Sequence, residues 1–457
     1  MAEKPLKQEL EAYLQAHPET RYLEALIADM NGILRGKRAE RDDFHKLFGD
    51  GMNMCAATII LDSRGNTFET IPYGVNDGDP DVRGMAVPGS LAPVPWVSVP
   101  TAQVLVEMNN IDGTPYPRDP RHVLRQAMQP LCDLGLRPVL ATELEFYLVE
   151  HDGERFLPRM PRIPGSELPQ PGLQYAMMED LYEVDDFLAD LDAICVAQNI
   201  PAGAALSEFS PGQFEVNLHH VDDPVLACDH AVLLKRAIKA AASKNGLGAT
   251  FMAKPFADNA GSGLHVHISL LDADGENVFA GESRDGPFSD RLRHAIGGLG
   301  ALMPESMAIF APNANSFRRH APGSYVPASP TWGLNHRGVA MRIPLSSPAN
   351  TRVEHRVAGA DANPYLVVAA LLAGIHHGLS EQVEPGPVTP ESAQIAYQAT
   401  VPVRWTQALD AFDAGALLPR YIGQPYRDLF SRCRREEEGN YNAEIPTKDF
   451  DWYLRAV

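Results

Sequence analysis

Five short stretches of the chain alternate between aliphatic residues and residues that carry a charge or an imidazole. In GSGLHVHISL, His265 and His267 alternate with Leu264, Val266 and Ile268. Successive side chains of a β-strand point to opposite faces, so this pattern predicts a strand with one apolar and one polar face. TELEFYLVE, SPGQFEVNLHH, VAMRIP and TRVEHRV repeat the pattern. The chain must therefore build a sheet that buries one face of all five segments.

The polar faces of these strands carry Glu, His and Arg and scarcely any Lys. For a single strand, the ordinary interpretation is a face exposed to water. Glu143 and Glu145, however, would repel each other on a shared face unless a cation lay between them. Five strands with the same bias indicate a shared, cation-filled cavity. The candidate ligands are Glu143, Glu145, Glu208, Glu215, His265 and Glu354.

This ligand set favours Mg²⁺ or Mn²⁺, because hard divalent cations prefer carboxylate oxygens. Zinc on the H-x-H pair is the alternative, although zinc sites usually carry more nitrogen or sulfur. Arginines also crowd into the last third of the chain, and we interpret them as part of the alternating strands. They are Arg319, Arg337, Arg342, Arg352 and Arg356. Divalent metals beside arginines that bind phosphate are typical of phosphoryl transfer. The sequence has no Walker A motif, so metals and arginines would have to hold any nucleotide phosphates.

The 457 residues are long for one ordinary domain and indicate two. Residues 111–121 are rich in Pro, Gly and Asp, so we place a boundary there, between domains of residues 1–114 and 115–457. The first part predicts strands, one of them in CAATIILDSRGN, and a hairpin turn at Asn31 and Gly32. The second part alternates strands with helices and predicts an α+β fold with the helices packed outside a sheet. The expected helices are residues 180–198, 224–244, 290–310 and 364–378.

The formal net charge of −20 argues against nucleic acid as a partner, since phosphate backbones need a basic surface. The five cysteines form no C-x-x-C and indicate free thiols in a reducing compartment. The N-terminus has no apolar segment typical of a signal peptide, and the longest apolar run, residues 365–375, is too short for a membrane span. We expect a cytoplasmic protein without a membrane partner.

Seven segments together resemble the signatures of the glutamine synthetase family, in that family's order. They are ELEF, EFSPGQFE, NAGSGLHVHISL, PNANSFRRHAPG, NHRGVAMRIP, RVEHR and ADANPYL. The resemblance implies a small N-terminal β-grasp domain and a large catalytic domain with an antiparallel sheet funnel. It also implies a homododecamer of two hexameric rings, with active sites between subunits. The implied reaction uses ATP to join the γ-carboxylate of glutamate to an amine through γ-glutamyl phosphate.

The resemblance also implies a role for each matching residue. Glu145, Glu208 and Glu215 match the ligands of one metal, and Glu143, His265 and Glu354 match those of a second. The residues that match nucleotide contacts are His267, Ser269, Arg337, Arg342 and Arg352. Arg337 and Arg342 also match catalytic groups at the transferred phosphate. The residues that match the glutamate pocket are Glu145, Gly261, Arg319 and Arg356.

Authentic glutamine synthetases have two segments that serve ammonium, and this chain departs from both. The Asp-Gly-Ser-Ser segment is replaced by Asp50, Gly51, Met52 and Asn53, and the flap glutamate is absent after Pro322 and Gly323, where Ser324 and Tyr325 stand. Binding a small cation needs a tight charged pocket, so these losses favour a larger amine.

Five segments resemble γ-glutamylpolyamine synthetases: DMNGILRGKR, GMNMCAATIILDSRGN, GSYVP, SPTWGLNHRGVAMRIP and RVAGADANPYL. This resemblance implies putrescine or another polyamine as the amine. Tyr325, His320 and Asp50 are candidates for the base, and Trp332 is either a channel wall or a core residue. The alternatives are an ammonium-using glutamine synthetase, a γ-glutamyl ligase for another small amine, a catalytically inactive family member and an H-x-H metal hydrolase.

Overall fold

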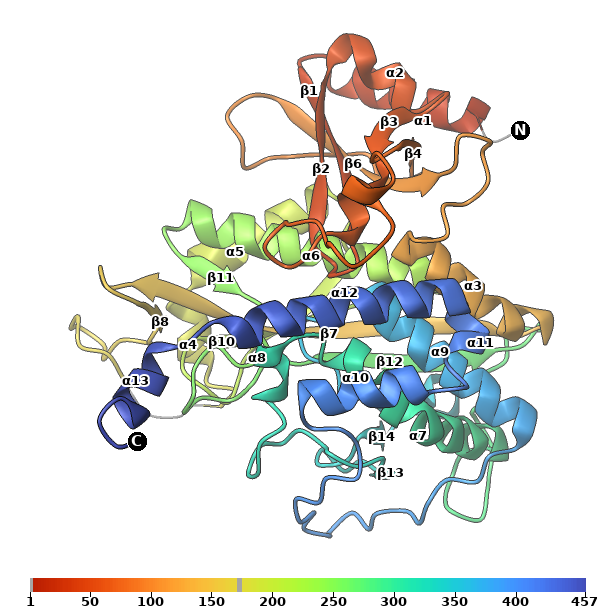
Figure 1. Ribbon diagram of the computed structural model, residues 1–457, viewed down its shortest axis with the longest axis vertical. Helices are drawn as coiled ribbons and strands as arrows, with labels where there is room; N and C mark the ends of the chain where they lie inside the picture. The colour runs from red at the N-terminus through yellow and green to blue at the C-terminus, as the bar shows by residue number, and fades with distance from the viewer. Residues whose placement is uncertain (1–2, 171–174) are drawn as a thin grey trace.

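Two β-sheets organise the computed structural model, which describes residues 3–170 and 175–457 (Figure 1). The first sheet has the order β2-β1-β6-β4-β3, with β5 paired to β6. β1 runs parallel to β6, and the other pairs are antiparallel. Its strands are β1 (Tyr22–Ala28), β2 (Leu34–Glu40), β3 (Met52–Cys55), β4 (Asp81–Ala86), β5 (Ala92–Pro93) and β6 (Thr101–Asn109). This mixed sheet lies at the top of Figure 1, beside α1 (Glu3–Ala16) and α2 (Phe44–Leu47).

The predicted hairpin at Asn31 and Gly32 is confirmed, because β1 and β2 pair on either side of it. Gly32 has φ +76°, a conformation that favours glycine. The strand expected in CAATIILDSRGN is wrong: Ala56–Ile60 forms the 3₁₀ helix η2. Most of its short apolar run is buried, and such a run does not distinguish a strand from a buried helix. The remaining 3₁₀ turns are η1 (Arg41–Asp43), η3 (Gly74–Asn76) and η4 (Pro348–Asn350).

The second sheet follows the order β13-β14-β15-β12-β7-β10-β9, with β8 and β11 paired to β7. The five stretches with a polar face form five consecutive neighbours in it: β14, β15, β12, β7 and β10. Its strands are β7 (Arg137–His151), β8 (Phe156–Pro158), β9 (Ala202–Ser207), β10 (Gln213–Leu218), β11 (Gly248–Thr250), β12 (Leu264–Leu271), β13 (Trp332–Leu334), β14 (Met341–Ile343) and β15 (Val353–His355). The predicted α+β fold is confirmed.

Helices pack outside this second sheet. α6 (Pro224–Lys244) and α7 (Asp290–Phe310) span the expected ranges, and the buried α9 (Pro364–Glu381) runs three residues further than expected. The single helix expected over residues 180–198 is wrong. It is two helices, α4 (Met178–Tyr182) and α5 (Asp185–Ala197), because Val184 leaves the helical conformation with φ −126° and ψ 24°. The other helices are α3 (Pro120–Asp133), α8 (Ala314–Phe317), α10 (Trp405–Ala414), α11 (Pro419–Ile422), α12 (Gln424–Ala443) and α13 (Thr447–Tyr453).

Polar contacts join the turn between β1 and β2 to two helices that follow the second sheet in the chain. Asn363 caps α9 by accepting from Tyr365 and Leu366, and its Nδ2 donates to the Asp29 carbonyl in the β1–β2 turn at 2.9 Å. Arg434 of α12, which crosses the middle of Figure 1, donates to the side chain of Asn31. Among the described helices, none combines the length and apolar character needed to cross a bilayer.

Candidate active site

Strand register brings the proposed ligands together in directly opposed pairs. Across β7 and β12, Glu143 faces His265; across β7 and β10, Glu145 faces Glu215. Across β12 and β15, His267 faces Glu354. Residues directly opposed across antiparallel strands share a face and lie side by side. Leu144, Val266 and the other aliphatic residues between them are buried on the opposite face, so the core fixes which way the polar side chains point.

Three carboxylates form the first group. Oxygen atoms of Glu145, Glu208 and Glu215 all lie within 4.8 Å of one another. Glu208 reaches the group from the segment that joins β9 and β10, and the Glu145 carboxylate accepts the Gly263 N–H at 2.6 Å. The pKa of Glu208 is raised to about 7 by burial and then by Glu145. The pKa of Glu215 is raised to about 9 by burial and by its three glutamate neighbours. Acidic groups so crowded fit a divalent cation, because a cation would relieve their repulsion.

The second group combines carboxylates with both histidines. His265 Nδ1 lies 3.1 Å from Glu143 Oε2 and 4.0 Å from Glu354 Oε1. His267 Nε2 lies 2.8 Å from Glu143 Oε1 and also groups with Glu354 within 4.8 Å. Burial raises the pKa of Glu143, but its hydrogen bonds with the two histidines lower it overall. The group that contains Glu143 and Glu354 includes His267 instead of the expected His265, and His265 groups with Glu143 and Glu215. Nitrogen and carboxylate ligands at this spacing fit a second divalent cation.

Arg342, Arg352 and Arg356 contact the second group. We expected all five arginines to lie in strands, but only Arg342 does. Arg342 on β14 faces Glu354 and donates to it at 2.8 Å, and Arg356 also contacts Glu354. Burial raises the pKa of Glu354, but Arg356 and the histidines bring it down to about 2. Arg352 Nε donates to His267 Nδ1 at 3.1 Å. Arg319 follows the short helix α8, and Arg337 lies in an exposed turn; neither belongs to a strand.

Gly261 and Arg319 form a tight contact beside the first group. A Cβ on Gly261 would stand 2.7 Å from both the Ala253 carbonyl oxygen and the Arg319 side chain, so only glycine fits there. Arg319 is buried and donates to the Val357 carbonyl at 2.7 Å. The proposed glutamate residues Gly261, Arg319 and Arg356 thus lie together, because Arg319 also reaches the Arg356 carbonyl at 3.5 Å.

The residues considered for the amine lie in different surroundings. Tyr325 is 75% exposed in the loop after α8, and Asp50 is exposed in the N-terminal region. His320 is buried, which lowers its pKa to about 3, so its ring is neutral at pH 7. Trp332 is a core residue: it is 1% exposed, packs edge-on against Phe288, and donates to the Gly386 carbonyl.

Three side chains near the site were missed by the sequence interpretation. Tyr147 lies on β7 and donates to the Ala260 carbonyl at 2.7 Å; Gln213 on β10 donates to the Gly261 carbonyl at 3.1 Å. Both hold the loop that ends at Gly261. Their signal was present, since each continues the polar face of its strand. Tyr175 has a pKa raised by burial and by the nearby Glu208, and it gave no sequence signal because it lies outside any alternating stretch.

Comparison with known proteins connects this geometry to a family. Residues 117–453 match the family model described as glutamine synthetase, catalytic domain. The Gamma-glutamylputrescine synthetase PuuA of Escherichia coli (strain K12) is 40% identical over 98% of this chain and 94% of its own length. The Glutamate--isopropylamine ligase of a Pseudomonas species is 33% identical over 78% of this chain and 77% of its own length.

A solved structure has the same fold. The GmaS/ADP complex in conformation 1 superposes with a TM-score of 0.82 and 24% identity, covering 97% of this chain and 99% of that one. The matched catalytic model covers the whole second sheet, including every proposed metal ligand. The chain therefore belongs to the glutamine synthetase family.

Proposed function

We propose that this protein uses ATP to join the γ-carboxylate of L-glutamate to a primary amine of putrescine or another polyamine. The products are a γ-glutamylpolyamine, ADP and phosphate. The observation that carries the proposal is the cluster of carboxylates and histidines at the centre of the sheet. Glu145, Glu208 and Glu215 form one group that fits a divalent cation, and Glu143 and Glu354 form a second with a histidine, beside Arg342 and Arg356. The relative at 40% identity is a γ-glutamylputrescine synthetase by name, and the relative at 33% is a glutamate–isopropylamine ligase.

The proposed chemistry has two steps. The γ-carboxylate oxygen of glutamate takes the γ-phosphoryl group of ATP, and the amine nitrogen then attacks the acyl carbon, expelling phosphate and losing a proton. Mg²⁺ or Mn²⁺ would neutralise charge on the phosphoryl oxygens. Glu145, Glu208 and Glu215 would hold one ion, and Glu143, His265 and Glu354 the other. We assign the nucleotide phosphates to His267, Ser269, Arg337, Arg342 and Arg352.

Glutamate would bind beside Gly261, held by Arg319, Arg356 and Glu145. Two arginines that are fixed by backbone carbonyls and by Glu354 offer guanidinium groups to a carboxylate without rearranging. We place Tyr325 at the amine entrance, where its exposed ring stands after the flap residues Pro322 and Gly323. A larger amine suits this entrance, because the flap carries no carboxylate to coordinate ammonium.

An amine panel tests the proposal. Phosphate release would be measured with ATP, Mg²⁺ and glutamate held constant, while putrescine, cadaverine, spermidine, spermine, isopropylamine and ammonium are varied. We expect a diamine or polyamine to give the highest kcat/KM, at least about tenfold above ammonium, because each methylene group that a pocket binds changes kcat/KM by about tenfold or more. If ammonium gave the highest kcat/KM, the chain would be an authentic glutamine synthetase. If only a monoamine were used, it would be a ligase for another small amine.

The same proposal includes how the protein is organised in the cell. We assign residues 1–114 to an N-terminal β-grasp domain and residues 115–457 to the catalytic domain; β6 ends at Asn109 and α3 begins at Pro120. We also propose a cytoplasmic homododecamer of two hexameric rings, in which the N-terminal domain of one subunit completes the site of its neighbour.

A further inference from the structure

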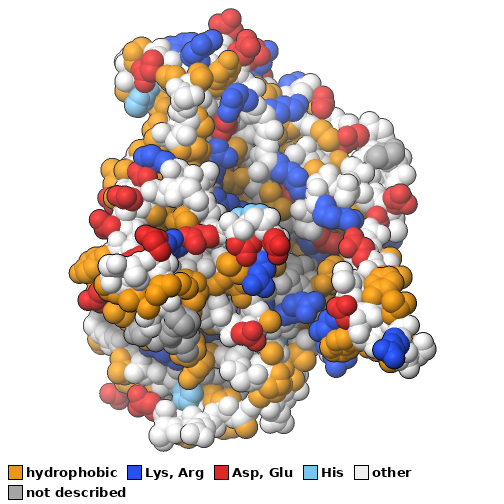
Figure 2. Space-filling model, turned by 90° about the vertical axis from the view of Figure 1, so that its left-hand side faces the viewer, with side chains coloured by type: hydrophobic (Ala, Val, Ile, Leu, Met, Phe, Trp, Pro, Cys, Tyr) orange, Lys and Arg blue, Asp and Glu red, His pale blue; other side chains and the backbone are white. Residues whose placement is uncertain are grey.

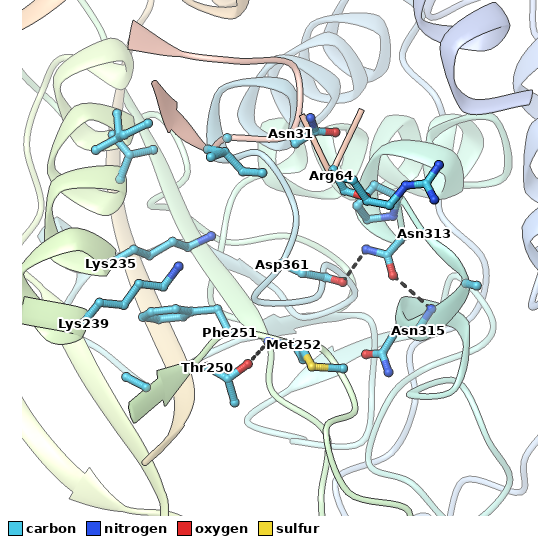
Figure 3. Close-up of a pocket in the computed structure, with 18 of the residues that line it drawn as sticks. Asn31, Arg64, Lys235, Lys239, Thr250, Phe251, Met252, Asn313, Asn315 and Asp361 are labelled. Carbon is cyan, nitrogen blue, oxygen red and sulfur yellow. Dashed lines mark hydrogen bonds between the residues drawn. The ribbon is translucent and has the colours of Figure 1, made fainter. Parts of the chain in front are cut away.

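A large cleft lies outside the proposed active site. It has a volume of about 1200 Å³ and opens between the N-terminal region and the helices of the catalytic region. One wall is α6, the opposite wall is the segment around α8, and the turn after β1 with the loop around Arg64 forms the top (Figure 3). None of the proposed metal ligands or nucleotide arginines lines it.

The cleft is positively charged, although the whole chain carries a formal charge of −20. Seven of the residues that line it are Lys or Arg, and three are Asp or Glu. Figure 2 shows Lys and Arg side chains gathered around a hollow on one face of the molecule, below the N-terminal region. A concentration of positive charge on an otherwise acidic protein indicates an anionic ligand, because a concave wall focuses the field of its charges.

Three of these cations, Lys235, Lys239 and Arg318, have no carboxylate within ion-pair distance among the described residues. Lys239 extends from α6 into the cleft, and Arg318 approaches it from the end of α8, where the only described hydrogen bond of its guanidinium is to the Tyr441 hydroxyl at 3.5 Å. Lys235 lies beside Lys239 and donates to the carbonyls of Ala360 and Ala362. Burial lowers the pKa of Lys235 to about 8, so a bound anion would favour its charged form.

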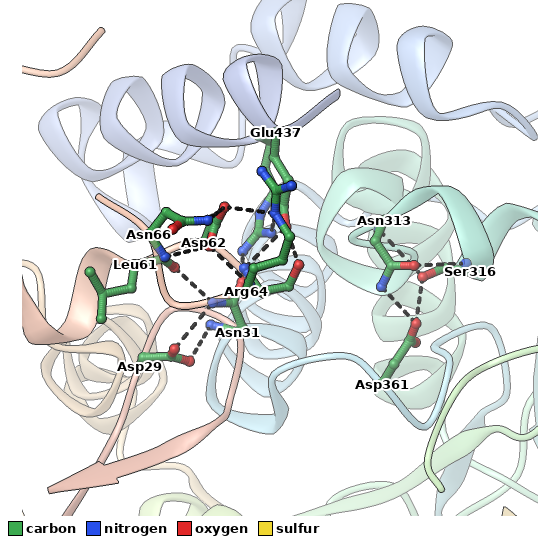
Figure 4. A network of polar contacts seen from close by, with 12 residues as sticks. Asp29, Asn31, Leu61, Asp62, Arg64, Asn66, Asn313, Ser316, Asp361 and Glu437 are labelled. Carbon is green, nitrogen blue, oxygen red and sulfur yellow. Dashed lines mark hydrogen bonds and ion pairs between the residues drawn. The ribbon is translucent and has the colours of Figure 1, made fainter. Parts of the chain in front are cut away.

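The walls of the cleft are held in place before any ligand binds. Figure 4 shows Asp29 and Asp62 fixing the turn and loop at the top through contacts with Asn31, Arg64 and Asn66. On the opposite wall, Asp361 accepts from Asn313 at 2.9 Å and from Ser316 at 2.7 Å. When the walls of a pocket are already ordered, ligand binding loses less conformational entropy, and more of the binding free energy is retained. The floor adds an apolar surface, the ring of Phe251.

The cleft also shares a wall with the proposed glutamate pocket. Asp361 anchors Asn313 and Ser316 at the start of α8, and Arg319 lies just beyond its end. The Lys254 N–H donates to the Asn315 side chain at 2.9 Å, next to Ala253, whose carbonyl abuts Gly261. A ligand between Lys239 and Arg318 would therefore touch segments that lead directly to Gly261 and Arg319.

We propose that this cleft binds a small organic anion with at least two negative charges, between Lys239 and Arg318, and that its occupancy changes the affinity for glutamate. A phosphate group and a pair of carboxylates share this chemistry. The effect on glutamate rests on the proposed function; the binding site does not.

Calorimetric titration of the full-length protein tests the site. Inorganic phosphate and succinate serve as probes, each titrated with and without saturating glutamate and Mg-ADP, which occupy the proposed active site. The test variant is Lys239→Gln with Arg318→Gln. The matched control is Arg291→Gln with Arg432→Gln, which removes the same charge from exposed positions that do not line the cleft. Thermal melts verify that both variants fold.

We expect one probe or both to bind the wild-type and control proteins, and to bind the test variant at least about tenfold more weakly, since two charge-assisted contacts are lost. The probe that binds identifies the source, phosphate or carboxylate. Equal binding in all three proteins, or no binding of either probe, would overturn the site.

The second readout is the KM for glutamate with and without the binding probe. A probe-dependent change in the wild-type and control proteins, absent in the test variant, supports the coupling. An unchanged KM would overturn the coupling. A protein that turns over no ATP would overturn the proposed function, while the titrations would still decide the cleft.

Discussion

Glu143 is the side chain on which the two groups of ligands converge. It contacts both His265 and His267, and it raises the pKa of Glu215 in the first group. Both histidines lie more than 120 positions further along the chain. The Glu143 carboxylate thus interacts electrostatically with both groups of ligands. A change of charge in one group therefore affects the pKa values in the other.

At the level of single residues, the sequence predicted which of the proposed ligands share a face of the sheet. Alternation placed Glu143, Glu145 and His265 on one face, and the strand register confirms that they meet. It did not predict that His267 would lie as close to Glu143 as His265 does, because the distance across strands depends on rotamers and register. Tyr175 also could not be predicted, since its position depends on how the chain folds between β8 and β9.

The first prediction concerns two proposed ligands. Glu145→Ala and His265→Ala should each lower turnover at least about a hundredfold at saturating Mg²⁺ or Mn²⁺, because removing a ligand costs more than removing the groups that support one. Circular dichroism should show that both variants still fold. Ser269→Ala is the comparison variant on the same strand face and should keep measurable turnover. Near-normal turnover by Glu145→Ala would contradict the assignment of Glu145 as a metal ligand.

A second prediction concerns stability and pH. In the metal-free protein, the pKa values of Glu208 and Glu215 are raised to about 7 and about 9, above an ordinary value of 4.5. Each carboxyl group therefore stabilises the folded state fully at a pH below 4.5, its pKa in the unfolded chain. This stabilisation is lost as the pH rises through the pKa of the same group in the folded protein.

In EDTA, the melting temperature should fall by several degrees, about 5 °C or more, between about pH 5 and pH 9. With Mg²⁺ present the fall should be smaller, since the ion takes the place of the protons. Glu208→Gln should flatten the part of the curve between about pH 5 and pH 7, because an amide does not titrate. An identical slope with and without Mg²⁺ would contradict the ligand assignment.

Among the elements, the long strand β7 organises the site, because it pairs with both β12 and β10. Helices were predicted most accurately where they are long and capped: Asp223 caps α6 and Ser289 caps α7, and both helices begin where expected. Prediction failed where tertiary packing decides. Val184, where the helix breaks, and most of the 3₁₀ helix Ala56–Ile60 are buried against other parts of the chain. The local sequence pattern does not predict such contacts.

The capping residue Asn363 gives a prediction at this scale. Asn363→Ala should lower the free energy of unfolding by about 1–2 kcal/mol, because it removes both the cap of α9 and the bond to Asp29. Asn363→Asp keeps the cap oxygen but loses the donor, so it separates the two effects. Chemical denaturation followed by tryptophan fluorescence measures both. Equal stability of the alanine variant and the wild type would show that the cap is dispensable.

For the whole molecule, the key question is whether one chain suffices for activity. If the N-terminal domain completes a neighbouring site, mass photometry should show particles of about twelve times the mass of one chain. Specific activity should then fall with the fraction of assembled particles as the protein is diluted or dissociated. Glutamate binding, measured at the same protein concentrations, would show whether the active sites lose their ligand as the particles dissociate. Full activity in a stable monomer would contradict this arrangement.

The spread of the ligands along the chain has a consequence for folding kinetics. The segments that carry Glu143 and His265 are separated by 122 positions, and Glu354 arrives later still on β15. Loops of that length must close before such pairings form, so these contacts belong to the slow, high-contact-order part of folding. No short fragment can assemble the cluster. During refolding, the moment at which the chain first captures a divalent ion would therefore mark the completion of the catalytic sheet.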